Sequence, residues 1–248
     1  MRGYLWIVIA AMSFGGCLTP AVALDADEII ARNVAARGGL DQLKSLNNLS
    51  FTGRVIFPGA NFDVTALRIV QRGGSVREDF KLQGLTMVTA YDGVQAWKID
   101  PFQGRKDPEL MPADQAKSLK LEGDLDSPLV DYRSKGHSAE YLGLEDVDGT
   151  PAYKLRLHLK SGDQLLYYLD PDTYMIIRVV QNQTVRGVEQ EFETDYGEYE
   201  KVGGVYFPMV EQSGLKHSAE SEKQQLVFAT AVANELPPAG FFSFPAGK

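Results

Sequence analysis

Few residues in this 248-residue sequence have the types and spacing that catalysis or metal binding requires. The histidines, His137, His158 and His217, have no second histidine or cysteine at ligand spacing, so we expect no transition-metal site. Ser138 lies in a Gly-His-Ser-Ala-Glu run that approaches a nucleophile elbow, but Glu140 replaces the second glycine of that motif. A serine of this kind is typical of a loop, and we expect no enzyme activity.

Two aspartate pairs look like the beginnings of binding loops. Residues 146–149 (Asp-Val-Asp-Gly) start like a calcium loop but lack the bidentate glutamate that such a loop needs. Residues 170–172 (Asp-Pro-Asp) fit a turn between two strands, because proline presets the turn dihedral and aspartate caps nearby amides. The sequence also lacks a glycine-rich phosphate cradle. We therefore expect no metal and no cofactor.

The charge balance excludes some partners. Lysine and arginine number 25 against 33 aspartates and glutamates, which gives a net charge of −8 at pH 7. Neutralising phosphates requires a surplus of basic residues, so we expect no nucleic-acid partner. Hydrophobic residues make up 44% and charged residues 23%, an ordinary globular composition. The single cysteine, Cys17, excludes an internal disulfide.

The first residues have the pattern of an export signal. An apolar run over 5–14 is followed by Ala-Val-Ala at 21–23, the small-x-small pattern after which signal peptidase cuts. The run is shorter than the ~20 apolar residues of a transmembrane helix. We expect residues 1–23 to be a signal peptide and the mature protein to be periplasmic. A lipid anchor at Cys17 is the less favoured alternative, because Phe14 stands where that motif usually has an aliphatic residue.

The mature chain starts with two predicted helices and continues mostly as strands. Asp25 and Glu28 form a capping box for the first helix, which Gly38 ends, and a short second helix follows over 40–46. Alternating apolar residues and tight turns then predict about twelve strands in one domain over 24–248. The predicted strands are 51–57, 63–72, 75–82, 85–91, 94–100, 140–147, 151–160, 163–170, 174–182, 187–199, 204–212 and 222–233.

Residues 107–136 interrupt the run of strands. Pro112 can open a helix that continues to Leu121, and Pro128 can open another that ends at Arg133. A sheet with one apolar face must curl and be covered, and these helices and the N-terminal one are the available covers. We expect the segment from 112 to 133 to be a movable lid, with four residues facing the sheet: Leu119, Leu121, Leu129 and Val130.

The apolar faces of the strands give the candidate ligand contacts. Strand 151–160 alternates apolar and basic residues, so one of its faces is buried and the other is solvated. Apolar stripes of this kind also fit an ordinary core that binds nothing. The candidate ligand-binding residues on these stripes are Phe80, Leu82, Met87, Trp97, Ile99, Leu155, Leu157 and Phe192.

One stretch at the end of the first strand run resembles a known family. Residues 88–102 (VTAYDGVQAWKIDPF) are similar to the strand, Asp-Gly turn, Trp strand and Asn/Asp-Pro-Phe of the bacterial outer-membrane lipoprotein-sorting (LolA-like) carriers. Residues 167–170, 203–208 and 236–245 also resemble members of that superfamily. The chain departs from the carriers in having Ala96 before the tryptophan, where they tend to have leucine, and in being longer.

The resemblance implies a mainly β fold, an unclosed antiparallel β-barrel whose mouth is plugged by helices. It implies a periplasmic carrier that holds the acyl chains of a lipid or lipoprotein and ferries them between membranes, with an inner- or outer-membrane protein as a further partner. Such a carrier needs an apolar cavity and no catalytic group. Two alternatives stay open: a lipid- or lipoprotein-sensing regulator of a membrane partner, and a lipid hydrolase that uses paired carboxylates or Ser138.

Overall fold

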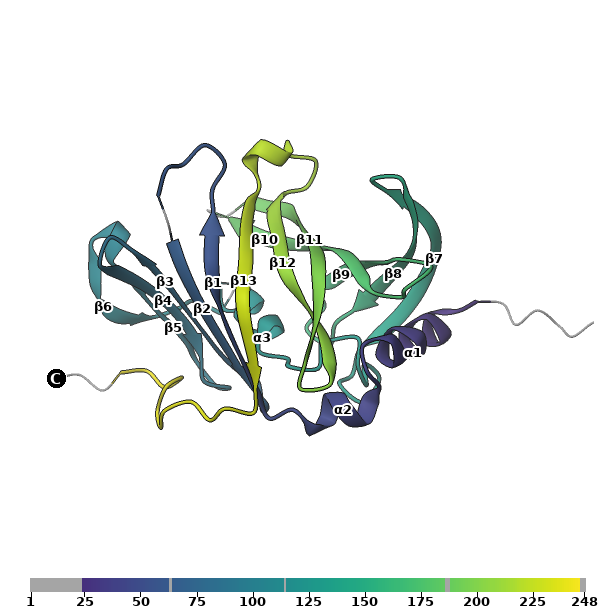
Figure 1. The fold of residues 1–248 in the computed structure, drawn as a ribbon, viewed down its shortest axis with the longest axis horizontal. Coiled ribbons are helices and arrows are strands. Elements are labelled where there is room, and N and C mark those ends of the chain that lie inside the picture. The colour runs from purple at the N-terminus through teal and green to yellow at the C-terminus, as the bar shows by residue number, and fades with distance from the viewer. Residues whose placement is uncertain (1–23, 63, 114, 186–187, 246–248) are drawn as a thin grey trace, which may run out of the picture.

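The computed structural model describes residues 24–62, 64–113, 115–185 and 188–245. Within these residues, thirteen antiparallel strands form one curved sheet in the order β6-β5-β4-β3-β2-β1-β13-β12-β11-β10-β9-β8-β7 (Figure 1). The strands are β1 (Asn48–Ile56), β2 (Val64–Gln71), β3 (Ser75–Leu82), β4 (Leu85–Tyr91), β5 (Ala96–Asp100), β6 (Arg105–Leu110), β7 (Ser138–Val147), β8 (Thr150–His158), β9 (Gln164–Leu169), β10 (Ile176–Val185), β11 (Val188–Val202), β12 (Val205–Leu215) and β13 (Gln224–Ala233).

The helices of the described residues are short. They are α1 (Ala26–Ala36), α2 (Leu40–Ser45) and α3 (Lys117–Glu122), with 3-10 turns η1 (Pro101–Gln103) and η2 (Glu220–Glu222). The predicted cap of α1 is confirmed, since the Asp25 carboxylate accepts a hydrogen bond from the Glu28 amide at 2.9 Å. No helix among the described residues has the length and apolarity that crossing a bilayer requires.

The sheet consists of two meanders that meet in its middle. The first steps outward from β1 to β6, and the second returns from β7 at the opposite edge to β13, which pairs with β1. The chain therefore has to pass from one edge of the sheet to the other between the two meanders. Residues 115–137, called here the crossing segment, make this passage and include α3 (Figure 1). The edge strands β6 and β7 do not pair with each other, so the predicted unclosed barrel with helices is confirmed.

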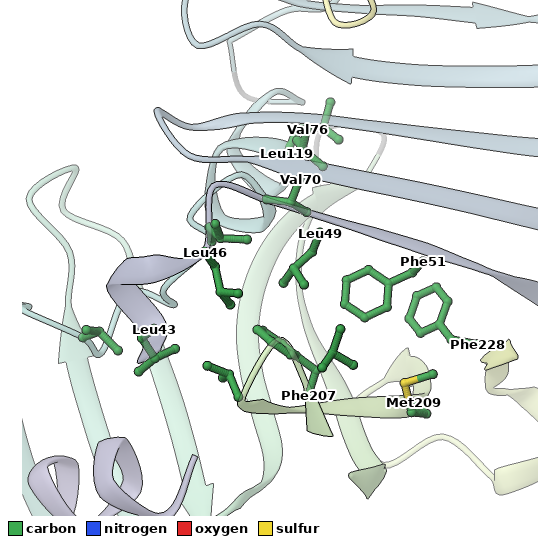
Figure 2. Close-up of a cluster of buried hydrophobic side chains, with 14 of the residues drawn as sticks. Leu43, Leu46, Leu49, Phe51, Val70, Val76, Leu119, Phe207, Met209 and Phe228 are labelled. Carbon is green, nitrogen blue, oxygen red and sulfur yellow. The ribbon is translucent and has the colours of Figure 1, made fainter. Parts of the chain in front are cut away.

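The main core lies where the two meanders and the helices meet. Phe51 of β1 packs against Phe228 of β13 and Phe207 of β12, with ring centroids 4.9 Å and 6.0 Å away (Figure 2). Burial of such side chains stabilises the fold by roughly 1.5–3 kcal/mol each. Helices α2 and α3 contribute Leu43 and Leu119 to the same cluster, and Leu46 follows directly after α2; Leu49, Val70, Val76 and Met209 of the sheet lie beside them.

Two expectations for the interruption between the meanders are wrong. The sequence assigned no strand after 100, but β6 forms over Arg105–Leu110; its Pro108 is tolerated because an edge strand leaves one row of amides unpaired. The helix expected from Pro128 to Arg133 is absent from the described residues, which form turns there. Ser127 and Asp131 adopt positive φ angles of 82° and 52°, which a right-handed helix does not accept.

Two further expectations stay predictions. The signal peptide over 1–23 and the alternative anchor at Cys17 fall outside the described residues. The assignment of 24–248 to one domain stays a prediction as well.

Candidate functional site

A cavity of about 820 Å³ lies on the concave face of the sheet, against α3 and the crossing segment. Its volume falls in the range of ~300–1,000 Å³ that is usual for small-molecule sites. Strands of both meanders supply its walls, which are mainly apolar. Apolar side chains that line it include Leu49, Val55, Phe57, Phe62, Val64, Phe102, Leu165, Ile176, Val179, Phe207 and Leu226.

Four of the residues predicted from the sequence line this cavity. Phe80 and Leu82 come from β3, Met87 from β4 and Phe192 from β11. Phe80 and Met87 are direct partners in the β3–β4 ladder, so their side chains stand next to each other on the same face. The structure thus brings together residues from both meanders. Their contact with a ligand stays a prediction.

Trp97 and Ile99 do not line the cavity. They pack against Ala90 and Phe244 on the other face of the sheet. The reason is the register of the β4–β5 hairpin, which pairs Trp97 with Ala90. Because side chains alternate along a strand, Ala90 faces away from Met87, and Trp97 and Ile99 face away with it. We therefore do not include either residue in the proposed binding surface.

Leu155 and Leu157 also lie outside the cavity wall, although they belong to the covered face. Both are fully buried in a cluster with Ile29 of α1 and Leu129 of the crossing segment. Their ladder partners on β9, Tyr167 and Leu165, do line the cavity. Helix α1 thus closes one end of the concave face, and the cavity begins beyond it.

The four expected lid residues have two different environments. Leu121 lines the cavity. Leu119 is buried in the main core, while Leu129 and Val130 have no exposed surface and pack into the two largest clusters. Leu129 and Val130 are therefore part of the core, while α3 and the residues that follow it up to Pro128 face the cavity.

Asp126 fastens the crossing segment to the body of the protein. Its buried carboxylate accepts two hydrogen bonds of 2.9 Å from the Arg72 guanidinium and one of 2.6 Å from Lys44. The buried Arg37 donates to the Asp126 carbonyl oxygen at 3.1 Å. Burial opposes ionisation of Asp126, but the hydrogen bonds from Arg72 and Lys44 outweigh it and lower the pKa to about 2. A bidentate arginine pair of this kind fixes position as well as charge.

A charged cluster that sequence reasoning missed lies in the wall of the cavity. Arg68 of β2 donates to Glu78 of β3 and to Glu211 of β12, each at 2.7 Å. Glu122 of α3 lines the same cavity and makes no ion pair among the described residues. One signal could have revealed this cluster: Arg68 occupies the apolar stripe of its strand, where a charge needs a buried partner.

The environment of Glu122 disfavours its charged form. Glu122 lies inside the cavity, and its side chain is still exposed to the solvent there. The surrounding protein limits its access to bulk water and raises the pKa to about 8, with repulsion from Glu78 and Glu211 adding to the effect and Arg68 opposing it. The Arg68 cluster carries a net negative charge when Glu78 and Glu211 are ionised. A further negative charge at Glu122 is therefore costly in this cavity.

Comparison with solved structures identifies the fold. A DUF1329 family protein from Desulfovibrio piger matches with a TM-score of 0.58 and 11% identity, over 88% of this chain and 96% of that one. A LolA superfamily protein from Nitrosomonas europaea matches with a TM-score of 0.57 and 14% identity, over 88% and 98%. A lipoprotein-sorting domain from Vibrio parahaemolyticus, described as putative by its source, matches with a TM-score of 0.55 and 12% identity, over 88% and 97%.

The chain therefore has a LolA-like fold, an open antiparallel half-barrel with a cavity on its concave face. The resemblance seen in residues 88–102 is confirmed at the level of the fold. No protein-family model matches the sequence, and the search of curated proteins gave no significant match.

Proposed function

We propose that this protein is a periplasmic carrier that binds the acyl chains of a lipid or lipoprotein in the concave cavity and ferries them between membranes. One observation carries the proposal: an apolar cavity of about 820 Å³ lies between the sheet and α3. Each CH₂ group that leaves water gains about 0.8 kcal/mol, so an acyl chain can be held there without a catalytic group.

The position of the polar groups supports a chain with a polar end. Apolar side chains from both meanders line most of the cavity, and the Arg68, Glu78 and Glu211 cluster occupies one part of its wall. A ligand that is apolar along most of its length and polar at one end matches such a wall. Its apolar part contacts the apolar side chains, and its polar end can form hydrogen bonds with the charged side chains of the cluster. The periplasmic location rests on the signal peptide expected over 1–23.

The first test asks whether the protein carries a lipid when it is isolated. The protein is purified from a bacterial host, extracted with organic solvent, and the extract is analysed by mass spectrometry. The proposal expects an acyl-containing lipid in the extract, and the intact mass of the mature protein is expected to begin at Leu24. A protein that yields no lipid and does not bind an uncharged pyrene-labelled long-chain alcohol contradicts the carrier proposal.

A matched pair of variants tests the cavity itself. Gln181 of β10 lines the cavity, and its neighbour Asn182 is exposed on the opposite face of the same strand. Gln181→Trp fills part of the cavity and is expected to weaken binding of the pyrene-labelled alcohol at least tenfold, whereas Asn182→Trp leaves binding unchanged. Equal binding by the two variants would place the probe elsewhere.

The same purified protein can be used to test the two alternative functions, a sensor of lipids and a lipid hydrolase. A membrane protein that co-purifies with the lipid-bound form and not with the lipid-free form favours a sensor. Turnover of ester substrates that Ser138→Ala abolishes favours a hydrolase; Ser138 starts the edge strand β7, is exposed, and does not line the cavity.

A further inference from the structure

Glu122 occupies a special position in the cavity. It is the last residue of α3, and Gly123 follows it in such close contact with the turn between β2 and β3 that a Cβ atom there would lie 2.4 Å from the Gly74 carbonyl oxygen. Leu119, one turn earlier, is buried in the main core. The backbone of α3 is thus held on both sides of Glu122, which keeps this residue at the cavity wall.

The charged groups that face Glu122 come from the sheet. Glu78 of β3 and Glu211 of β12 repel its negative charge, and Arg68 of β2 attracts it. Arg68 is already paired with both of these glutamates at 2.7 Å. On the side of β4, Tyr91 is covered by Lys120, whose ammonium lies 5.7 Å from the ring centroid.

Asp124, the next acidic residue of the crossing segment, has Lys135 as its partner. Among the described residues Glu122 makes no ion pair of this kind, so water in the open cavity solvates its charged form. An apolar ligand that fills the cavity displaces this water and leaves the charged form without a partner.

We propose that Glu122 couples ligand binding to proton uptake, so that the protein holds an apolar chain while Glu122 is neutral and releases it when Glu122 becomes charged. This inference rests on the proposed carrier function, because it concerns the same cavity. In this proposal α3 holds Glu122 at the cavity wall, next to the place of the bound chain.

The sign of the expected pH dependence follows from linkage. In the empty cavity the pKa of Glu122 is already raised to about 8, and a bound apolar chain raises it further by removing water. Below about pH 8 both states are protonated and affinity does not change with pH. Above about pH 8 the empty state loses its proton first, so affinity falls by up to about tenfold per pH unit.

The experiment measures binding of the uncharged pyrene-labelled long-chain alcohol to the full mature protein between pH 6.5 and pH 9.5, values chosen as roughly 1.5 units on either side of the Glu122 pKa. The probe has no titratable group, so a change in affinity belongs to the protein. We expect Kd to be constant up to about pH 8 and to rise beyond it. Calorimetry in two buffers of different ionisation enthalpy is expected to show proton uptake on binding near pH 8.5.

Two variants assign the effect to one residue. Glu122→Gln keeps the shape and removes the charge, so its Kd is expected to be independent of pH over the whole range. Glu235→Gln changes an exposed glutamate in the C-terminal tail and is expected to retain the pH dependence of the natural protein. Circular dichroism at each pH checks that the variants are folded. The calorimetric measurement of proton uptake uses the unchanged protein, so it tests the proposal even if a variant does not fold.

The outcomes separate the two proposals. Absence of probe binding at every pH overturns the carrier function. Binding that is constant to pH 9.5 with no proton uptake overturns the role of Glu122 and leaves the carrier function intact. A pH dependence that Glu122→Gln retains overturns the role of Glu122 in the same way.

Discussion

At the scale of single residues, two acidic side chains of the crossing segment differ: Asp126 has several partners that hold structure, whereas Glu122 makes no ion pair among the residues that the structure describes. Asp126 has Arg72, Lys44 and Arg37 around it. Glu122 lines the cavity without a cation of its own. Both are acidic residues of the crossing segment, and their pKa values move in opposite directions because one has gained hydrogen-bond donors and the other has lost water.

Asp126→Asn tests the first of these environments. The folded pKa of about 2 lies below the ordinary value of 3.8, so Asp126 stabilises the protein above about pH 4, and this contribution is lost as pH falls toward 2. We expect the variant to lose roughly 2–4 kcal/mol at pH 7 in urea unfolding, because Arg72 loses a buried partner, and to lack this acid-dependent decline. Asp131→Asn is the control, since Asp131 is 39% exposed and its pair with Lys44 contributes at most about 1 kcal/mol. Equal losses in the two variants contradict the assignment.

Residue patterns alone predicted part of the cavity wall. Phe80, Leu82 and Met87 could be found because each lies on the apolar stripe of its own strand. The position of Trp97 could not, because the face it occupies depends on the length of the turn before it, and the register of the β4–β5 hairpin is a tertiary result. Arg68 was missed for a related reason: its partners lie on two other strands, and Glu211 is 143 residues away.

At the scale of elements, the C-terminal tail is a second cover that the sequence did not predict. The Trp97 indole donates to the Phe242 carbonyl oxygen at 2.8 Å, and Arg77 donates to the Phe241 carbonyl oxygen at 2.9 Å while its guanidinium stacks 4.4 Å from that ring. The sheet is therefore covered on both faces near β3–β5, and the assumption that only one face is apolar fails there.

Truncation after Gly240 tests the role of this tail. Removal of the residues after Gly240, which include Phe242 and Phe244, exposes Trp97, the one tryptophan among residues 24–248, so its emission is expected to shift to longer wavelength and the free energy of unfolding to fall by roughly 2–4 kcal/mol. Leu236→Ala, at a position 83% exposed, is expected to change neither quantity. In the intact protein, Trp97 emission is expected to stay constant when an unlabelled long-chain alcohol binds, because Trp97 does not line the cavity. Unchanged emission after truncation would show that the tail does not cover Trp97.

Helix α3 is expected to be the least stable part of the crossing segment. It has six residues, and a helix of that length depends on tertiary contacts. In hydrogen exchange of the ligand-free protein, its amides are expected to exchange faster than those of Leu155 in β8 and of Val130, both of which are fully buried, and to slow when the pyrene-labelled alcohol is bound. Protection of α3 equal to that of β8, with no effect of the probe, would make the helix a fixed wall.

At the scale of the whole molecule, the topology explains why a cavity and its cover occur together. The first meander ends at one edge of the sheet and the second begins at the opposite edge, so the connection between them has to cross the sheet, and it does so on the concave face, where it lines the cavity. The sequence predicted the strands and this interruption, because turn residues and alternation are local signals. It did not predict the order of the strands, which depends on the pairing of β1 with β13. In that ladder Thr52 lies opposite Thr230, 178 residues further along the chain.

At one position of the β1–β13 ladder, the two strands lie so close together that adding one methyl group should disturb their pairing. The β1–β13 ladder shifts register at Gly53, where the strands approach so closely that a Cβ atom would lie 2.1 Å from the Val227 carbonyl oxygen and 2.7 Å from the Phe228 Cα. Gly53→Ala must push β13 away from β1, and we expect a loss of more than about 2 kcal/mol in urea unfolding, together with weaker binding of the pyrene-labelled alcohol.

Gly197→Ala is the matched control for this substitution. Gly197 also lies within a strand, β11, without a positive φ angle, and a Cβ atom there meets open space. Alanine is expected to leave stability within about 1 kcal/mol of the natural protein, or to raise it slightly by reducing the freedom of the unfolded chain. Because the two variants add the same methyl group to the same sheet, the difference between them measures the contact of β1 with β13. Equal stability of Gly53→Ala and Gly197→Ala would show that the contact of β1 with β13 at Gly53 is loose enough to accept a methyl group.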